Sequence, residues 1–141
     1  MELNRRQALT LALAATALAA LPRDLFAASA SLDDAIAAFT GGAEIGEGGV
    51  TLTAPEIAEN GNTVPVEVVA PGAEAIIILA AGNPNPDVAT FHFGPLAASQ
   101  FASTRIRLAE TQDVIAIAKM TDGTFQQASQ EVKVTIGGCG G

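Results

Sequence analysis

Apolar residues recur along the chain in two patterns, one helical and one typical of β-strands. The helical pattern comes first, at Leu32, Ala35, Ile36 and Phe39. These spacings place the four side chains on one face of a helix. Ser31 precedes them with an acidic residue three positions further on, which is an N-cap signal, and Gly41-Gly42 follows as a stop. We therefore expect one short helix between Ser31 and Gly41.

The rest of the chain alternates between short apolar segments and turn signals. The expected strands cover residues 50–53, 64–68, 75–80, 88–93, about 103–109, 114–120 and a seventh segment ending with Val132, Val134 and Ile136. Pro71-Gly72 and Asp122-Gly123 are turn sequences, and residues 83–87 (NPNPD) predict a stiff loop. About seven short antiparallel strands in this arrangement predict an all-β, immunoglobulin-like β-sandwich.

The first 30 residues have the organisation of an export signal. Residues 8–21 contain only Ala, Leu and Thr, and this run of 14 is shorter than the roughly 20 residues of a membrane-spanning helix. Arg5-Arg6 precedes it, and Ala28-Ser29-Ala30 follows as a small-residue cleavage site. The arginine pair resembles a twin-arginine signal, which exports folded cargo to the periplasm. The alternative is an ordinary secretory signal that happens to contain two arginines.

Two of the expected strands are apolar on both faces, residues 75–80 and 114–118. A strand that is covered on one side only should be polar on the other. One explanation is a solvated face with scattered small apolar side chains. The interpretation favoured by a signal for folded cargo is that another protein covers this second face, as in a heterodimer.

Charge and composition restrict the function. The signal segment holds three of the 7 basic and two of the 15 acidic residues, so residues 31–141 keep four basic and thirteen acidic residues and a net charge of −9. Such a domain repels nucleic acid and anionic membrane surfaces. One His, one Cys and no Trp or Tyr leave little to bind a metal or a cofactor, or to act as a general base. We expect no enzyme, no metal and no cofactor.

The residue that carries chemistry is Cys139, the only cysteine, placed among Gly137, Gly138, Gly140 and Gly141. Glycine imposes little conformational preference, so residues 137–141 are expected to form a thin, flexible tail after a sandwich that covers residues 31–136. Three extended residues past Ile136 carry the thiol roughly 10 Å from the sandwich. Such a tail suits a swinging thiol that enters the active site of another protein. The alternatives are a disordered tail with an incidental cysteine and an engineered labelling tail.

The local sequence offers nothing that would activate this thiol. No Lys, Arg or His lies within five residues of Cys139, so no nearby cation favours the thiolate. A cysteine left unpaired in an exported chain indicates intermolecular bonding or a reactive thiol. The thiol is therefore expected to be a point of attachment rather than a catalyst.

The chain resembles the SoxY family of sulfur-carrier subunits from bacterial thiosulfate oxidation. The resemblance rests on the terminal GGCGG at 137–141 after a VTI strand end, together with the export signal. Supporting segments are residues 58–61 (AENG), 64–66 (VPV), 83–86 (NPNP), 104–108 (TRIRL) and 122–123 (DG). The similarity covers nearly all of the chain after the signal.

The resemblance implies a set of partners. Family members form a heterodimer with a SoxZ-type subunit, which lacks a signal and is exported alongside. A haem-containing enzyme joins thiosulfate oxidatively to the C-terminal cysteine. A di-manganese hydrolase then releases sulfate, and in some organisms a sulfane dehydrogenase oxidises the remaining sulfur. By this resemblance Cys139 is the point of covalent attachment.

Two functional classes stay open from the residues alone. The chain is either a covalent carrier of sulfur intermediates or a noncatalytic periplasmic adaptor whose cysteine forms an intermolecular disulfide. His92, the only histidine, is expected to be a surface or interface residue rather than a metal ligand. Arg105 and Arg107 alternate with Ile106 and Leu108, so they are expected to face solvent or an interface.

Overall fold

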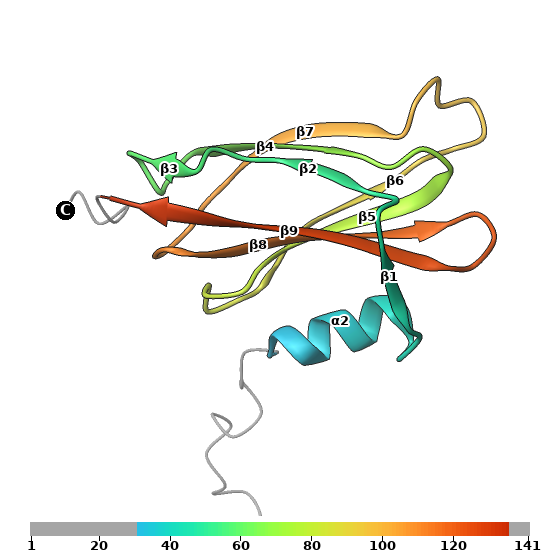
Figure 1. Ribbon diagram of the computed structural model, residues 1–141, viewed down its shortest axis with the longest axis horizontal. Coiled ribbons are helices and arrows are strands. Elements are labelled where there is room, and N and C mark those ends of the chain that lie inside the picture. Colours follow the sequence, from blue (N-terminus) through green and yellow to red (C-terminus); the bar gives the residue numbers. More distant parts are fainter. Residues whose placement is uncertain (1–30, 136–141) are drawn as a thin grey trace, which may run out of the picture.

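The computed structural model describes residues 31–135, which form one helix and nine strands (Figure 1). The elements are α2 (Leu32–Thr40), β1 (Ile45–Glu47), β2 (Thr51–Thr53), β3 (Ile57–Ala58), β4 (Val64–Val69), β5 (Ala73–Ala80), β6 (Asp87–His92), β7 (Phe101–Ile106), β8 (Gln112–Met120) and β9 (Phe125–Val134). Within this part of the chain no helix is long and apolar enough to cross a membrane.

The strands build two sheets that face each other as a sandwich (Figure 1). The larger sheet has the order β1-β9-β8-β5-β6, and β3 adds a short pairing to β9. The smaller sheet has the order β2-β4-β7. All pairings are antiparallel except those of β1 and β3, which run parallel to β9. The predicted all-β sandwich is confirmed.

The space between the sheets is filled by alternate side chains of the facing strands. The fully buried members of this core include Val64, Val66, Val68, Ile76, Ile78, Val114 and Val132. Their spacing of two residues within β4 and β5 is what a pleated strand requires when one face is inward. Each such side chain contributes about 1.5–3 kcal/mol of transfer free energy on burial.

A second apolar cluster lies on the other face of the larger sheet, beneath α2. Ile77 and Leu79 of β5 and Ile117 of β8 are buried there together with Phe125. The helix packs its Leu32, Ala35, Ile36 and Phe39 against them, and the rings of Phe39 and Phe125 meet edge to face at 5.9 Å. The chain itself therefore covers the second face, and the expectation that another protein covers it is wrong.

The local signals at the ends of α2 are confirmed. The Ser31 hydroxyl accepts the N–H of Asp34, and the Asp34 carboxylate accepts the Ser31 N–H, which is a capping box. Gly41 ends the helix with φ 67°, in the left-handed region that glycine enters without a steric penalty. The N-cap Ser31 and the C-cap Gly41 therefore set the two ends of α2.

The structure departs from the expected pattern at β6. Asp87 pairs with Leu79 and Ala89 with Ile78, so Val88 is an extra residue in a bulge. Val88 consequently packs towards the inter-sheet core, not beside His92 as regular alternation would place it. The short strands β1 and β3, which make nine strands instead of about seven, also lack a strong apolar alternation of their own.

We predict that Phe39→Ala lowers the free energy of unfolding by about 2 kcal/mol, because a half-buried ring and its contact with Phe125 are lost. Urea unfolding measures the change. Leu96→Ala is the control, since that side chain is 97% exposed and should change stability by less than about 0.5 kcal/mol. An unchanged midpoint for Phe39→Ala would mean that α2 does not hold this face.

Candidate functional site: the end of the last strand

The residues expected to carry the function lie outside the residues that the structure describes. These are Cys139 and the glycines Gly137, Gly138, Gly140 and Gly141. The structure does describe the chain up to Thr135, four residues before Cys139. The structure therefore describes the base of the tail, that is, the end of β9 and the loops that contact it.

The last residues of β9 are held by hydrogen bonds from both sides. On one edge, the N–H of Lys133 donates to the Glu56 carbonyl at 2.9 Å and the N–H of Thr135 donates to the Ala58 carbonyl at 3.2 Å. On the other edge, Val134 lies beyond the first residue of β8, Gln112, so no β8 residue pairs with it. Its N–H donates instead to the hydroxyl of Thr111, the residue before β8, at 2.9 Å. The attachment point of the tail is thus fixed through the last described residue.

A side-chain network ties the neighbouring loops together at this end. Asn83 donates from Nδ2 to the Arg107 carbonyl at 2.7 Å, and its Oδ1 accepts the Ala109 N–H at 2.9 Å. The same Oδ1 accepts Gln112 Nε2 at 2.9 Å, while Gln112 Oε1 accepts the Gly82 N–H at 2.8 Å. Gln112 is only 7% exposed, so these bonds satisfy an amide that would otherwise be costly to bury.

The same end gathers segments that are far apart in sequence. The Leu108 N–H donates to the Gly61 carbonyl at 2.7 Å, which joins residues 58–61 to residues 104–108. Asn83 joins the 83–86 loop to the same stretch. Three segments that carry the sequence resemblance therefore meet around the end of β9.

Sequence reasoning missed the residues that make this base. Thr111, Gln112 and the short strand β3 were not singled out, because each acts through a partner distant in sequence. Asn83 was recognised as part of a stiff loop and of a segment that supports the resemblance, but not for its hydrogen bonds. A signal was nevertheless present in Gln112, a polar residue that is buried at the start of β8, two positions before the apolar run 114–118.

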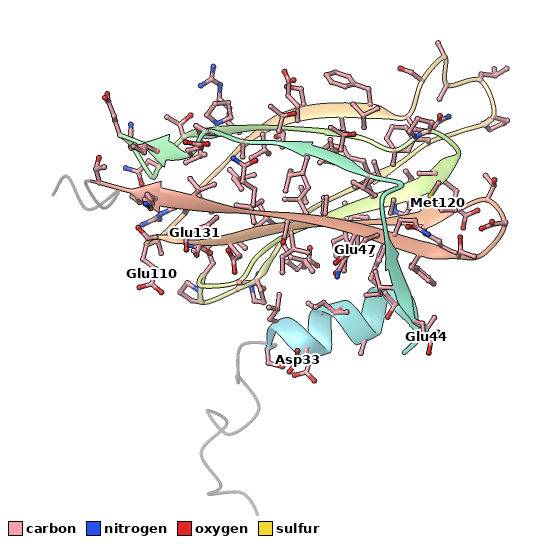
Figure 2. The ribbon with its side chains drawn as sticks, in the orientation of Figure 1. Asp33, Glu44, Glu47, Glu110, Met120 and Glu131 are labelled. Carbon is pink, nitrogen blue, oxygen red and sulfur yellow. The ribbon has the colours of Figure 1, made fainter. Side chains whose placement is uncertain are left out.

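Charges at this end are mixed. Figure 2 shows Glu110 and Glu131 at the end of the sandwich where β9 finishes, whereas Glu44 lies near the start of β1, towards the opposite end. Lys133 is the basic residue nearest to the tail in sequence, and its side chain is exposed. This end therefore offers carboxylates together with a single lysine close to the tail.

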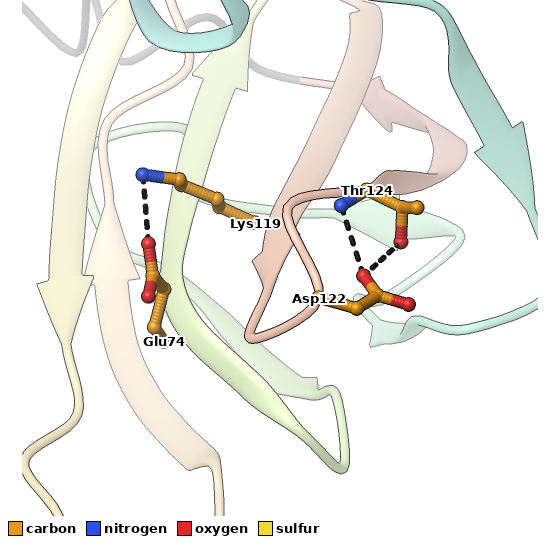
Figure 3. A network of polar contacts seen from close by, with 4 residues as sticks. All are labelled: Glu74, Lys119, Asp122 and Thr124. Carbon is orange, nitrogen blue, oxygen red and sulfur yellow. Dashed lines mark hydrogen bonds and ion pairs between the residues drawn. The ribbon is translucent and has the colours of Figure 1, made fainter.

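The polar contacts drawn in Figure 3 belong to the other end of β8. Lys119 forms an ion pair with Glu74 at 2.7 Å, an exposed contact of small energetic value. Asp122 accepts the hydroxyl of Thr124 at 2.6 Å and its N–H at 2.9 Å. These bonds, the hydroxyl first, lower the pKa of Asp122 below its usual value. They shape the β8–β9 hairpin, at the end of β9 opposite Thr135.

Neither His92 nor the arginines form a site in the described part of the chain. His92 is exposed on β6, and residues 31–135 contain no group of three or more His, Cys, Asp or Glu side chains that could hold a metal ion. Arg105 and Arg107 are exposed, while Ile106 and Leu108 are buried, as the alternation predicts.

Comparison with known proteins agrees with the sequence resemblance. The family model described as sulfur oxidation protein SoxY matches residues 36–139, a range that ends at the cysteine. The solved structure of the sulfur carrier protein SoxY from Chlorobium limicola f thiosulfatophilum is 42% identical, with a TM-score of 0.66. The match covers 75% of this chain and 97% of that one.

A more distant match shares the fold alone. A superoxide reductase (neelaredoxin) from Ignicoccus hospitalis is 20% identical, with a TM-score of 0.53, over 75% of this chain and 94% of that one. Among curated proteins, none matches this chain.

We predict that Thr111→Val speeds hydrogen exchange at the Val134 amide, because the variant keeps the shape of the side chain but removes its acceptor oxygen. The cost in global stability should stay near or below about 1 kcal/mol, since this bond is exposed to solvent. The Thr135 amide, bonded to Ala58, is the internal control and should exchange as in the parent. Equal exchange at Val134 in parent and variant would show that the hydroxyl does not hold the strand.

Proposed function

The chain belongs to the SoxY family of sulfur oxidation proteins, and on that premise we propose that it is a periplasmic carrier that holds sulfur intermediates covalently on Cys139. A family model that extends to the single cysteine is the observation that carries this proposal. As a sulfur carrier the protein is not itself the catalyst.

The base of the tail supports this role. Hydrogen bonds hold β9 through Thr135, and Cys139 lies four positions further along the chain. A fully extended chain spans about 3.3–3.6 Å per residue, so the Cα of Cys139 lies within about 14 Å of the Cα of Thr135. An enzyme that acts on this thiol must therefore approach the β9 end of the sandwich.

The resemblance to the SoxY family implies the loading step, and thiol chemistry gives its balance of atoms and electrons. The Cys139 sulfur forms a bond to the sulfane sulfur of thiosulfate, the thiol proton passes to solvent, and two electrons pass to the haem enzyme as the oxidant. Water then attacks the terminal sulfonate sulfur at the di-manganese hydrolase, which releases sulfate and leaves a persulfide on Cys139. The carrier contributes the sulfur atom that is bonded throughout.

The enzymes must supply the activation and the charge recognition. No Lys, Arg or His lies within five residues of Cys139, and residues 31–141 carry a net charge of −9. A negative domain does not attract a dianion such as thiosulfate. Cationic groups that bind thiosulfate and favour the thiolate therefore belong to the active sites that receive the tail.

Assembly with a SoxZ-type subunit and export by the twin-arginine route complete the proposal. The Arg5-Arg6 signal for folded cargo supports joint export with a partner that lacks a signal. The apolar second faces of β5 and β8 no longer support the heterodimer, because α2 covers them. A sulfane dehydrogenase that acts on the persulfide is a further partner where that branch exists.

We predict that Cys139→Ser abolishes every thiosulfate adduct and all thiosulfate-dependent electron transfer with the purified enzymes. A serine hydroxyl forms no sulfur–sulfur bond, so loading has no acceptor atom. Intact mass spectrometry and haem reduction measure the two effects. The unfolding midpoint should match that of the parent, which separates lost chemistry from lost structure.

Two results would contradict this proposal. Thiosulfate oxidation at the parental rate by Cys139→Ser would remove the carrier role. A parent that gains no thiosulfate adduct but forms a stable disulfide with another periplasmic protein would instead support the adaptor function.

A further inference from the structure

Ile57 is an exposed apolar side chain beside the base of the tail. Only three large apolar side chains are strongly exposed within residues 31–135, namely Ile57 at 57%, Leu96 at 97% and Phe101 at 47%. Leu96 follows β6 and Phe101 begins β7, so both lie at the end of the sandwich opposite the end of β9 (Figure 1). Ile57 alone of the three is placed where the tail begins.

The pairing of β3 with β9 fixes that placement. Ile57 is in register with Lys133, and the next residue, Ala58, is in register with Val134 and accepts the Thr135 N–H. Paired residues in adjacent strands lie about 4.8 Å apart and project to the same face. Ile57 therefore lies beside Lys133, two residues before Thr135. Its backbone cannot shift without breaking the hydrogen bonds that hold Lys133 and Thr135.

Two hollows are lined by this side chain. One, of about 480 Å³, is lined by Ile57 with Glu56, Gln130, Glu131 and Lys133. The other, of about 430 Å³, is lined by Ile57 and Ala58 with Pro55, Asn60, Thr63 and Pro65 among others. Ile57 is thus an exposed apolar side chain that lines two hollows, and an apolar pocket of a partner could enclose it.

We propose that Ile57 and its flanking hollows are the surface on which the receiving enzyme docks while Cys139 is in its active site. This inference rests on the proposed carrier function. The occupant follows from the length of the tail, because an enzyme that holds a thiol within about 14 Å of Thr135 must cover the surface around Thr135. Apolar side chains that become fully enclosed are the ones that contribute most to such interfaces.

The chemistry of the docking partner follows from the lining residues. The enzyme should present an apolar socket for Ile57 at the mouth of its active-site channel. The rim of that socket should be polar and should pair with the carboxylates of Glu56 and Glu131 and with the ammonium group of Lys133. The same surface serves each enzyme that takes the tail in turn, because the tail length is the same for all.

The test compares Ile57→Ser with Leu96→Ser in the mature carrier assembled with its partner subunit. Both variants remove an exposed apolar side chain, at opposite ends of the sandwich. The kcat/KM for loading of thiosulfate by the purified haem enzyme should fall about tenfold in Ile57→Ser and stay at the parental value in Leu96→Ser. Ile57→Leu should retain most of the parental kcat/KM, because it preserves the apolar contact.

Alkylation of Cys139 by iodoacetamide provides the second readout. Its rate should be equal in the parent and in Ile57→Ser, since the small reagent does not dock. Faster alkylation in Ile57→Ser would overturn the proposal by showing that the chain's own tail rests on this surface. A dimer of the parent that Ile57→Ser dissociates in size-exclusion chromatography would overturn it in favour of a second copy as the occupant.

The kinetic outcome is equally decisive. Parental kcat/KM in Ile57→Ser, or an equal loss in Leu96→Ser, would overturn the docking assignment. Loading of the parent in the same assay and its absence in Cys139→Ser would show that the carrier function itself stands. Failure of the docking surface is therefore distinguishable from failure of the carrier.

Discussion

The hydrogen bonds that hold β9 to its last described residue are the constraint on which the proposed presentation of the thiol depends. The N–H groups of Lys133, Val134 and Thr135 are all paired, alternately with the β3 edge and with the Thr111 hydroxyl. If the end of β9 frayed, more residues would be free of the sheet and the point at which the tail leaves the sandwich would vary. Because the strand is held, the reach of the thiol is set by the four residues that follow.

The packing of the two sheets and of α2 stabilises the strands beside β9. β8 and β5 form the middle of the larger sheet, buried by the smaller sheet on one side and by α2 on the other. A strand covered on both faces is protected from fraying and holds its neighbours in register. The anchoring of β9 therefore depends on the most deeply buried part of the domain.

Local signals in the sequence were sufficient for the elements whose partners are close by. The capping box of Ser31, the left-handed Gly41 and the alternation of β4 were predicted because each depends on residues a few positions away. The position of α2 on the sheet was not predicted, since an apolar second face at Ile77 and Ile117 indicates a cover but not its identity. The parallel pairings of β1 and β3, the bulge at Val88 and the Thr111 contact likewise depend on distant partners. For the site, the sequence predicts Cys139, which lies outside the described residues, and the structure describes the end of β9 that precedes it.

The most direct test of the carrier account is mass spectrometry of this protein isolated from the periplasm of cells that are oxidising thiosulfate. The account predicts a chain shortened by its first 30 or so residues, with thiosulfate- or sulfur-derived mass on the C-terminal peptide that contains Cys139. Reductant should remove that added mass. Cys139 found only as the free thiol, or only in a disulfide with another protein, would contradict the account.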